Sequence, residues 1–196
     1  MKKLIMISKI ISNIFSPLIN STIAFALLIF FSRNISYPLK YLLFFLACMF
    51  STLLPILYVF VMHKIGEVKQ FDIIDRLERL NPLIFGIFSY SIGFILLSLL
   101  DAPPLVTGLM FCYATNTFLV YLITRQWKVS IHTTGVGGPL VALTYFFGKI
   151  ILPFYVLILI VGGSRLILKR HTIGQVLVGI FIGLLVTTVQ LELLFV

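Results

Sequence analysis

Long apolar runs alternate with short polar stretches along the whole chain, and this alternation limits the possible fold more than any other feature. Several runs contain about 20 residues, and a helix of that length crosses the roughly 30 Å hydrocarbon core of a bilayer. Hydrophobic residues make up 60% of the 196-residue chain and charged residues 11%, against about 45–50% and about 25% in soluble domains. We therefore expect an integral membrane protein.

The formal net charge is +9, which in other contexts would suggest a nucleic-acid partner. Here the cations lie in short stretches between apolar runs, a pattern typical of membrane topology, so we expect no nucleic acid to bind. Cys48 and Cys112 both lie inside apolar runs, and we interpret them as buried small hydrophobes. The opening Met-Lys-Lys resembles the start of a signal peptide, but Lys9 interrupts the apolar segment, so we expect a retained first span.

The pattern predicts an all-α, polytopic transmembrane helical bundle of six to seven hydrophobic helices, forming one integral-membrane domain over residues 1–196. One apolar run, 140–161, is open to two interpretations. It is either a single span or, because Gly148-Lys149 and Pro153 interrupt it, a pair of short helices. Expected helices cover residues 11–31, 41–62 with a kink at Pro55, 83–100, 105–124, 134–147, 152–166 and 172–195.

Three polar stretches carry residues that suit phosphoryl transfer. Cations and hydroxyl groups can hold phosphate oxygens, and an imidazole can act as a nucleophile or as a general acid. The residues of interest are Lys69, Arg76 and Arg79 in the first stretch, Lys128, Ser130 and His132 in the second, and Ser164, Arg165, His171 and Gln175 in the third.

These residues resemble the type 2 phosphatidic acid phosphatase superfamily, whose three motifs are K-x6-R-P, P-S-G-H and S-R-x5-H-x3-D. The spacing of Lys69 and Arg76 matches the first motif, with Leu77 in place of the proline. The second motif keeps only its serine and histidine, as Ser130 and His132.

The third motif is the most specific of the three. Ser164-Arg165 and His171 keep its spacing, but Gln175 stands where the superfamily has aspartate. The resemblance runs from about residue 63 onward. It implies a phosphatase that uses neither a metal nor another cofactor and that forms a phosphohistidine intermediate.

The resemblance also implies a role for each site residue. His171 would attack phosphorus, and His132 would protonate the leaving oxygen. The phosphate oxygens would be held by Lys69, Arg76, Ser130, Ser164 and Arg165, with Arg79 either joining them or pairing with Asp75 or Glu78. Gly135, Gly137 and Gly138 would let the backbone approach the phosphate.

Gln175 is the main departure from the superfamily pattern. Four residues after His171 on a helix, its amide oxygen can accept the imidazole N–H and fix the tautomer. It supplies no negative charge to stabilise an imidazolium, so we expect the geometry to survive and the rate to fall. Asp72 and Asp75 are the nearest carboxylates that could substitute.

One site requires all three polar stretches on one membrane face. That condition excludes a single span over 140–161 and requires two short helices that turn at Gly148-Lys149. All but three of the 15 lysines and arginines then share the site face, the exceptions being Arg33, Lys40 and Lys149. The positive-inside rule places this face in the cytoplasm, most simply at the cell inner membrane.

The predicted function is hydrolysis of a lipid phosphate or diphosphate of phosphatidate or polyprenyl type, with the membrane and the lipid as partners. The alternatives are transfer to an acceptor other than water and a non-catalytic transporter or binder of anionic headgroups. Simpler structural roles are expected for other residues: interfacial for His63, headgroup anchoring for Lys169 and Arg170, and the aromatic belt for Trp127. The spacing of the histidines disfavours a metal site.

Overall fold

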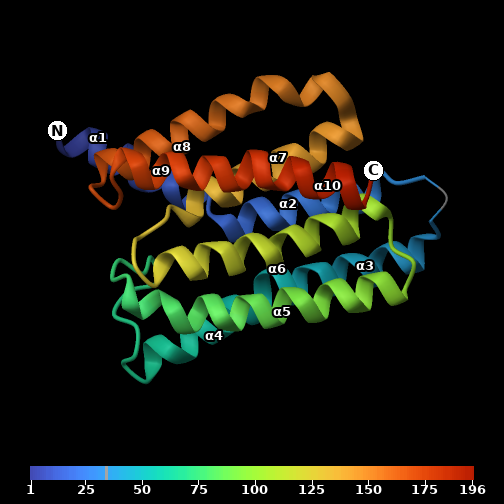
Figure 1. The fold of residues 1–196 in the computed structure, drawn as a ribbon, viewed down its shortest axis with the longest axis horizontal. Coiled ribbons are helices and arrows are strands. Elements are labelled where there is room, and N and C mark those ends of the chain that lie inside the picture. The colour runs from blue at the N-terminus through green and yellow to red at the C-terminus, as the bar shows by residue number, and fades with distance from the viewer. Residues whose placement is uncertain (34) are drawn as a thin grey trace.

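The computed structural model describes residues 1–33 and 35–196, and all regular structure in these ranges is helical. The helices pack into one elongated bundle (Figure 1). In order, they are α1 (Lys2–Ile14), α2 (Pro17–Phe30), α3 (Tyr37–Cys48), η1 (Met49–Leu53), α4 (Leu54–Lys64), η2 (Leu77–Arg79), α5 (Leu80–Leu99), α6 (Pro104–Thr124), α7 (Ile131–Phe147), η3 (Gly148–Tyr155), α8 (Val156–Ile167), α9 (Ile173–Phe181), η4 (Ile182–Val186) and α10 (Thr187–Leu194).

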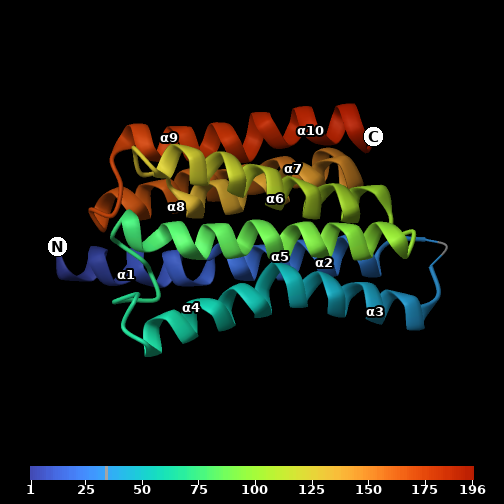
Figure 2. The ribbon, with the colours of Figure 1, turned by 60° about the horizontal axis from the view of Figure 1, so that its bottom comes forward.

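The described helices are long and apolar enough for five membrane spans, or six if the bent pair α1–α2 is one span. The expectation of an integral membrane helical bundle is therefore confirmed. The chain runs back and forth along the long axis, and α3–α4 and α9–α10 lie on opposite outer sides of the bundle (Figures 1 and 2). A buried apolar cluster, which includes Phe25, Leu43, Leu109 and Leu191, holds α2, α3, α6 and α10 together.

The first span differs from the expected single helix over 11–31. It begins at Lys2 and bends by 43° between α1 and α2. Pro17 has no N–H to continue the helical hydrogen bonds, and the Ser16 side chain accepts a bond from the Ile19 N–H instead. The bend is thus a new helix start, and it leaves α1 free to pack against α8.

Pro55 disturbs the second span, as its position predicts, but a π-helical segment absorbs the irregularity. In η1 the carbonyl of Phe50 would receive its i+5 bond from residue 55, and proline has no N–H to give. The Ser89 hydroxyl donates to this carbonyl at 2.6 Å. A neighbouring helix therefore satisfies the freed backbone group inside the apolar bundle.

The expected helical hairpin between the second and third motifs is present. Helices α7 and α8 run in opposite directions and are joined by η3, which turns from Gly148, at φ 73°, through Pro153 (Figure 1). The return is fixed by a hydrogen bond from Lys128 Nζ, just before α7, to the Arg170 carbonyl, just after α8, at 2.8 Å. The alternative of one straight span over 140–161 is wrong.

The glycines of α7 have a different role from the one expected. Gly135 and Gly137 lie inside the helix and are buried. A Cβ on Gly135 would lie 2.7 Å from Pro17, and one on Gly137 would lie 3.0 Å from the Gly183 backbone. These glycines, with Gly138 beside Thr187, allow close helix packing and form no phosphate loop.

Candidate active site at the polar end

One end of the bundle collects the polar stretches. This polar end comprises α1 and residues 65–79, 125–132 and 164–175, and it lies at the left in Figure 1. The Arg76 guanidinium donates to the carbonyls of Thr124 and Arg125, and the Ser130 N–H donates to the Gln175 carbonyl at 3.1 Å. All three motifs therefore meet on one face.

Arg165 lies at the centre of the polar end. It is 1% exposed, on the last turn of α8. Its NH2 group is 2.9 Å from Asp72 Oδ1, and its NH1 group is 3.1 Å from Asp72 Oδ2 and 2.7 Å from Ser12 Oγ. Ser164, its neighbour, donates its hydroxyl to the Val161 carbonyl at 2.7 Å within the same helix. The guanidinium is thus held by residues outside the three motifs.

His171 and Gln175 adopt the arrangement expected from their spacing. The loop 168–172 ends at Thr172, whose side chain and Gln175 form a capping box at the start of α9. Gln175 Oε1 accepts from the Thr172 N–H and lies 3.2 Å from His171 Nδ1. Because this oxygen can only accept, Nδ1 carries the proton and Nε2 holds a lone pair.

The second motif contributes the start of α7. Ser130 is fully buried before the helix, and His132 is half-buried as its second residue. His132 lies within electrostatic range of Arg165, Asp72 and Arg79. The second histidine is therefore within electrostatic range of the same charged cluster as the first.

The cations of the first polar stretch are arranged differently from one another. Lys69 points into solvent, with its side chain 83% exposed and 3.6 Å from Glu78. Arg79 is buried, 5% exposed, and donates to the carbonyls of Ile73 at 2.7 Å and Val129 at 3.2 Å. The structure therefore brings Arg79 into the polar end with Arg165 and leaves Lys69 at its rim.

Four further residues belong to this cluster. Asp72 bridges Arg165 and the Nε of Arg170, the latter at 3.7 Å, so Arg170 pairs within the protein rather than only anchoring headgroups. Lys128 and Ser12 complete the set through the bonds given above. A carboxylate inside a run of cations was the signal available for Asp72, and nothing local marks Ser12.

Burial and crowding of cations decide the charge states here. Burial, with the charges of Arg79, Lys128 and Arg165, lowers the pKa of His171 to about 3, so the imidazole is neutral at pH 7. Burial and Arg79 also lower the pKa of Lys128, to about 8. Burial would raise the pKa of Asp72, but Arg165 outweighs it and holds the pKa below its usual value.

Three buried polar atoms of the motif residues have no hydrogen-bond partner among the residues that the structure describes. They are Ser130 Oγ, Arg165 Nε and His171 Nε2. An unmet buried polar group costs about 1–3 kcal/mol. A hydroxyl, a guanidinium N–H and an imidazole lone pair together suit a phosphoryl group, with donors for its oxygens and a nucleophile for its phosphorus.

Residues 103–195 match the model of the PAP2 superfamily. This match, over just under half of the chain, supports membership of that superfamily. The matched region contains the second and third motifs and the hairpin between them, and the first motif precedes it. No curated protein and no solved structure matches the chain. The match indicates a phosphatase-type enzyme that acts on phosphate esters.

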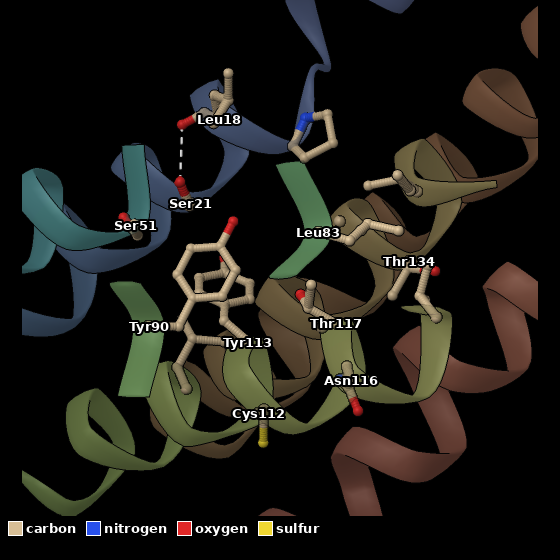
Figure 3. Close-up of a pocket in the computed structure, with 16 residues that line it drawn as sticks. Leu18, Ser21, Ser51, Leu83, Tyr90, Cys112, Tyr113, Asn116, Thr117 and Thr134 are labelled. Carbon is tan, nitrogen blue, oxygen red and sulfur yellow. Dashed lines mark hydrogen bonds between the residues drawn. The ribbon is translucent and has the colours of Figure 1, made fainter. Parts of the chain in front are cut away.

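A separate cavity of about 60 Å³ lies deeper in the bundle (Figure 3). Its lining includes Tyr113 and Asn116 of α6, whose hydroxyl and Oδ1 have no partner in the described part of the chain. Ile131 and Gly138 of α7 also line it, whereas His132 projects from another side of that helix. The cavity has room for a few waters, and none of the histidines, lysines or arginines of the three polar stretches lines it.

Proposed function

We propose that the polar end hydrolyses a lipid phosphate or diphosphate through a phosphohistidine intermediate, without a metal. The observation that carries this proposal is that His171 Nε2, Ser130 Oγ and Arg165 Nε, all at the polar end, are buried and have no hydrogen-bond partner among the described residues. A phosphoryl group would satisfy all three atoms at once. The low pKa of His171, about 3, keeps the nucleophile in its reactive neutral form.

The chemistry follows in two steps. His171 Nε2 attacks phosphorus, the bond from phosphorus to the leaving oxygen breaks, and His132 gives that oxygen a proton. Water then attacks the phosphohistidine, His132 takes up its proton, and inorganic phosphate leaves with His171 restored. Arg165, Arg79 and Ser130 stabilise the charge that develops on the phosphoryl oxygens.

Gln175 supports only part of this two-step reaction. It holds the productive tautomer through the 3.2 Å contact with Nδ1, but its neutral amide offers no charge to the imidazolium that forms during attack. A slower first step is the expected consequence. The same residue favours the alternative function, a transporter or binder that holds an anionic headgroup without cleaving it.

The substrate class follows from the location of the site. The polar end caps a bundle of membrane-spanning helices, so a headgroup can enter it while an acyl or prenyl tail stays in the bilayer. Phosphatidate-type and polyprenyl-type phosphates both meet this condition. Because most lysines and arginines share this end, we place it on the cytoplasmic face of the cell inner membrane, within a single domain over 1–196.

The test is phosphate release from a panel of lipid phosphates by purified His171→Ala, which should show no turnover. His63→Ala is the matched control, because His63 lies at the same end but bonds the Val68 carbonyl at 2.8 Å and packs on Phe71. Vanadate should bind the unaltered protein and not His171→Ala. Undiminished turnover in His171→Ala would exclude this mechanism, and headgroup binding without turnover in the unaltered protein would favour the alternative.

A further inference from the structure

The guanidinium of Arg165 is held through its terminal nitrogens, whereas its Nε edge is buried without a partner in the described part of the chain. Its two terminal nitrogens are occupied by Asp72, at 2.9 and 3.1 Å, and by Ser12, at 2.7 Å. Its Nε has no partner among the described residues. A guanidinium offers a fixed, planar fork of donors, so clamping the terminal nitrogens also fixes the direction of the Nε edge.

The two clamping residues come from parts of the chain far from Arg165. Asp72 is 93 residues away in the sequence and Ser12 is 153 residues away. Both precede the region that matches the superfamily model. Ser12 is buried, at 4% exposure, so α1 is placed to reach α8 rather than to lie apart in the membrane.

Asp72 also places a negative charge where the motifs provide none. Arg165, Arg170, Arg79, Lys128 and His132 surround it. The neighbouring carboxylates are engaged elsewhere, since Asp75 accepts from the Leu77 N–H at 2.8 Å and Glu78 pairs with Lys69. With Gln175 neutral, Asp72 is the carboxylate that offsets the repulsion among these cations.

We propose that Asp72 and Ser12 are positioning residues that clamp the terminal nitrogens of Arg165 and present its Nε edge to the bound phosphoryl group. This inference rests on the proposed function, because it assigns these residues to the same site. Neither residue touches the substrate. Both act through Arg165, and that dependence can be measured.

The test is a double-mutant cycle on vanadate affinity, measured with the purified full chain. Asp72→Asn should weaken binding roughly tenfold, the scale found when a residue that orients a ligating side chain is removed. In an Arg165→Gln background the same change should alter affinity by less than about twofold, because the group through which Asp72 acts is gone. Asp72→Glu keeps the charge and should restore most of the affinity.

Matched controls separate positioning from general damage. Asp75→Asn makes the same chemical change in the same loop, at a carboxylate that bonds only the Leu77 N–H in the structure, and should leave affinity unchanged. Ser12→Ala should weaken binding by several-fold, whereas Ser8→Ala, one turn earlier on α1 and also buried, should not. Melting temperatures confirm that each variant is folded.

The possible outcomes separate failure of the positioning role of Asp72 from failure of the proposed phosphatase function. An equal loss on Asp72→Asn in both backgrounds would show that Asp72 acts independently of Arg165 and would overturn the inference alone. Stronger vanadate binding by Asp72→Asn would also overturn it, because Asp72 would then be a competitor for the anion. If the unaltered protein neither binds vanadate nor releases phosphate, the proposed function fails, and the role of Asp72 fails with it.

Discussion

Replacing Gln175 by glutamate should make His171 a stronger nucleophile. Glutamate matches the length of glutamine, and both satisfy the third position of a capping box, so α9 should keep its start at Thr172. The carboxylate would then lie where Gln175 Oε1 now lies, 3.2 Å from His171 Nδ1. The change therefore adds one charge with little alteration of shape.

The size of the effect can be worked from this distance. A unit charge about 4 Å from an imidazolium contributes about 1 kcal/mol in water and about 4 kcal/mol at an effective dielectric constant of 20. Since about 1.36 kcal/mol corresponds to one pKa unit, the pKa of His171 should rise by about one to three units. From about 3, it should reach about 4–6. Stabilising the imidazolium in the transition state by a similar energy should raise kcat roughly 10- to 1000-fold.

The assay is phosphate release from a lipid phosphate in detergent micelles as a function of pH. A histidine with a lowered pKa is neutral above that pKa, so the unaltered enzyme should lose activity through His171 only near pH 3. The acid limb of kcat/KM for Gln175→Glu should move upward by the same one to three units. Gln126→Glu, which adds a charge to an exposed position of the same end, is the control. A folded Gln175→Glu protein with an unshifted acid limb and unchanged kcat would refute the assigned contact between His171 and Gln175.

Two further predictions concern charge and packing. Lys128 has a pKa of about 8 and loses its charge as the pH rises through that value, so vanadate affinity should fall above pH 8. Lys128→Arg should remove this loss of affinity at alkaline pH. If the loss persists in that variant, Lys128 is not its cause. Gly183→Ala would put a Cβ 2.8 Å from the Thr134 carbonyl oxygen, and should lower the free energy of unfolding by about 1–3 kcal/mol. The control Gly163→Ala, with nothing within 4 Å of its added Cβ, should leave the free energy of unfolding unchanged or slightly higher. Equal melting temperatures for the two variants would contradict the packing role of Gly183.

The path of the chain could be predicted from the sequence because it depends on local signals and on whether the chain crosses the membrane an even or odd number of times between motifs. Apolar runs of sufficient length predict the spans, and the interruptions at Gly148 and Pro153 permit a turn. The requirement that three motifs share one face then selects the hairpin of α7 and α8 over one long span. Ser16-Pro17 is an equally local signal, a cap followed by a helix-starting proline, but we expected one helix over 11–31 and missed the break that it causes.

The contacts of individual polar side chains were less accessible. Gly135 and Gly137 suit either a phosphate loop or a close helix contact, and only the position of Gly183 on a distant helix separates these possibilities. Arg170 follows an apolar helix, as a headgroup anchor does, and its pairing with Asp72 depends on how a loop nearly 100 residues earlier folds back. No periodicity or spacing encodes such a pair, because its geometry exists only once the helices are packed.

The clamp on Arg165 also has a consequence for biosynthesis. Its partners, Ser12 and Asp72, are made long before Arg165, and α9, which carries Gln175, follows later still. The polar end cannot assemble until the last helices have joined the bundle, so catalytic competence should appear as a late, all-or-none event in folding. An incomplete chain in the bilayer would then have no means of acting on the surrounding lipids.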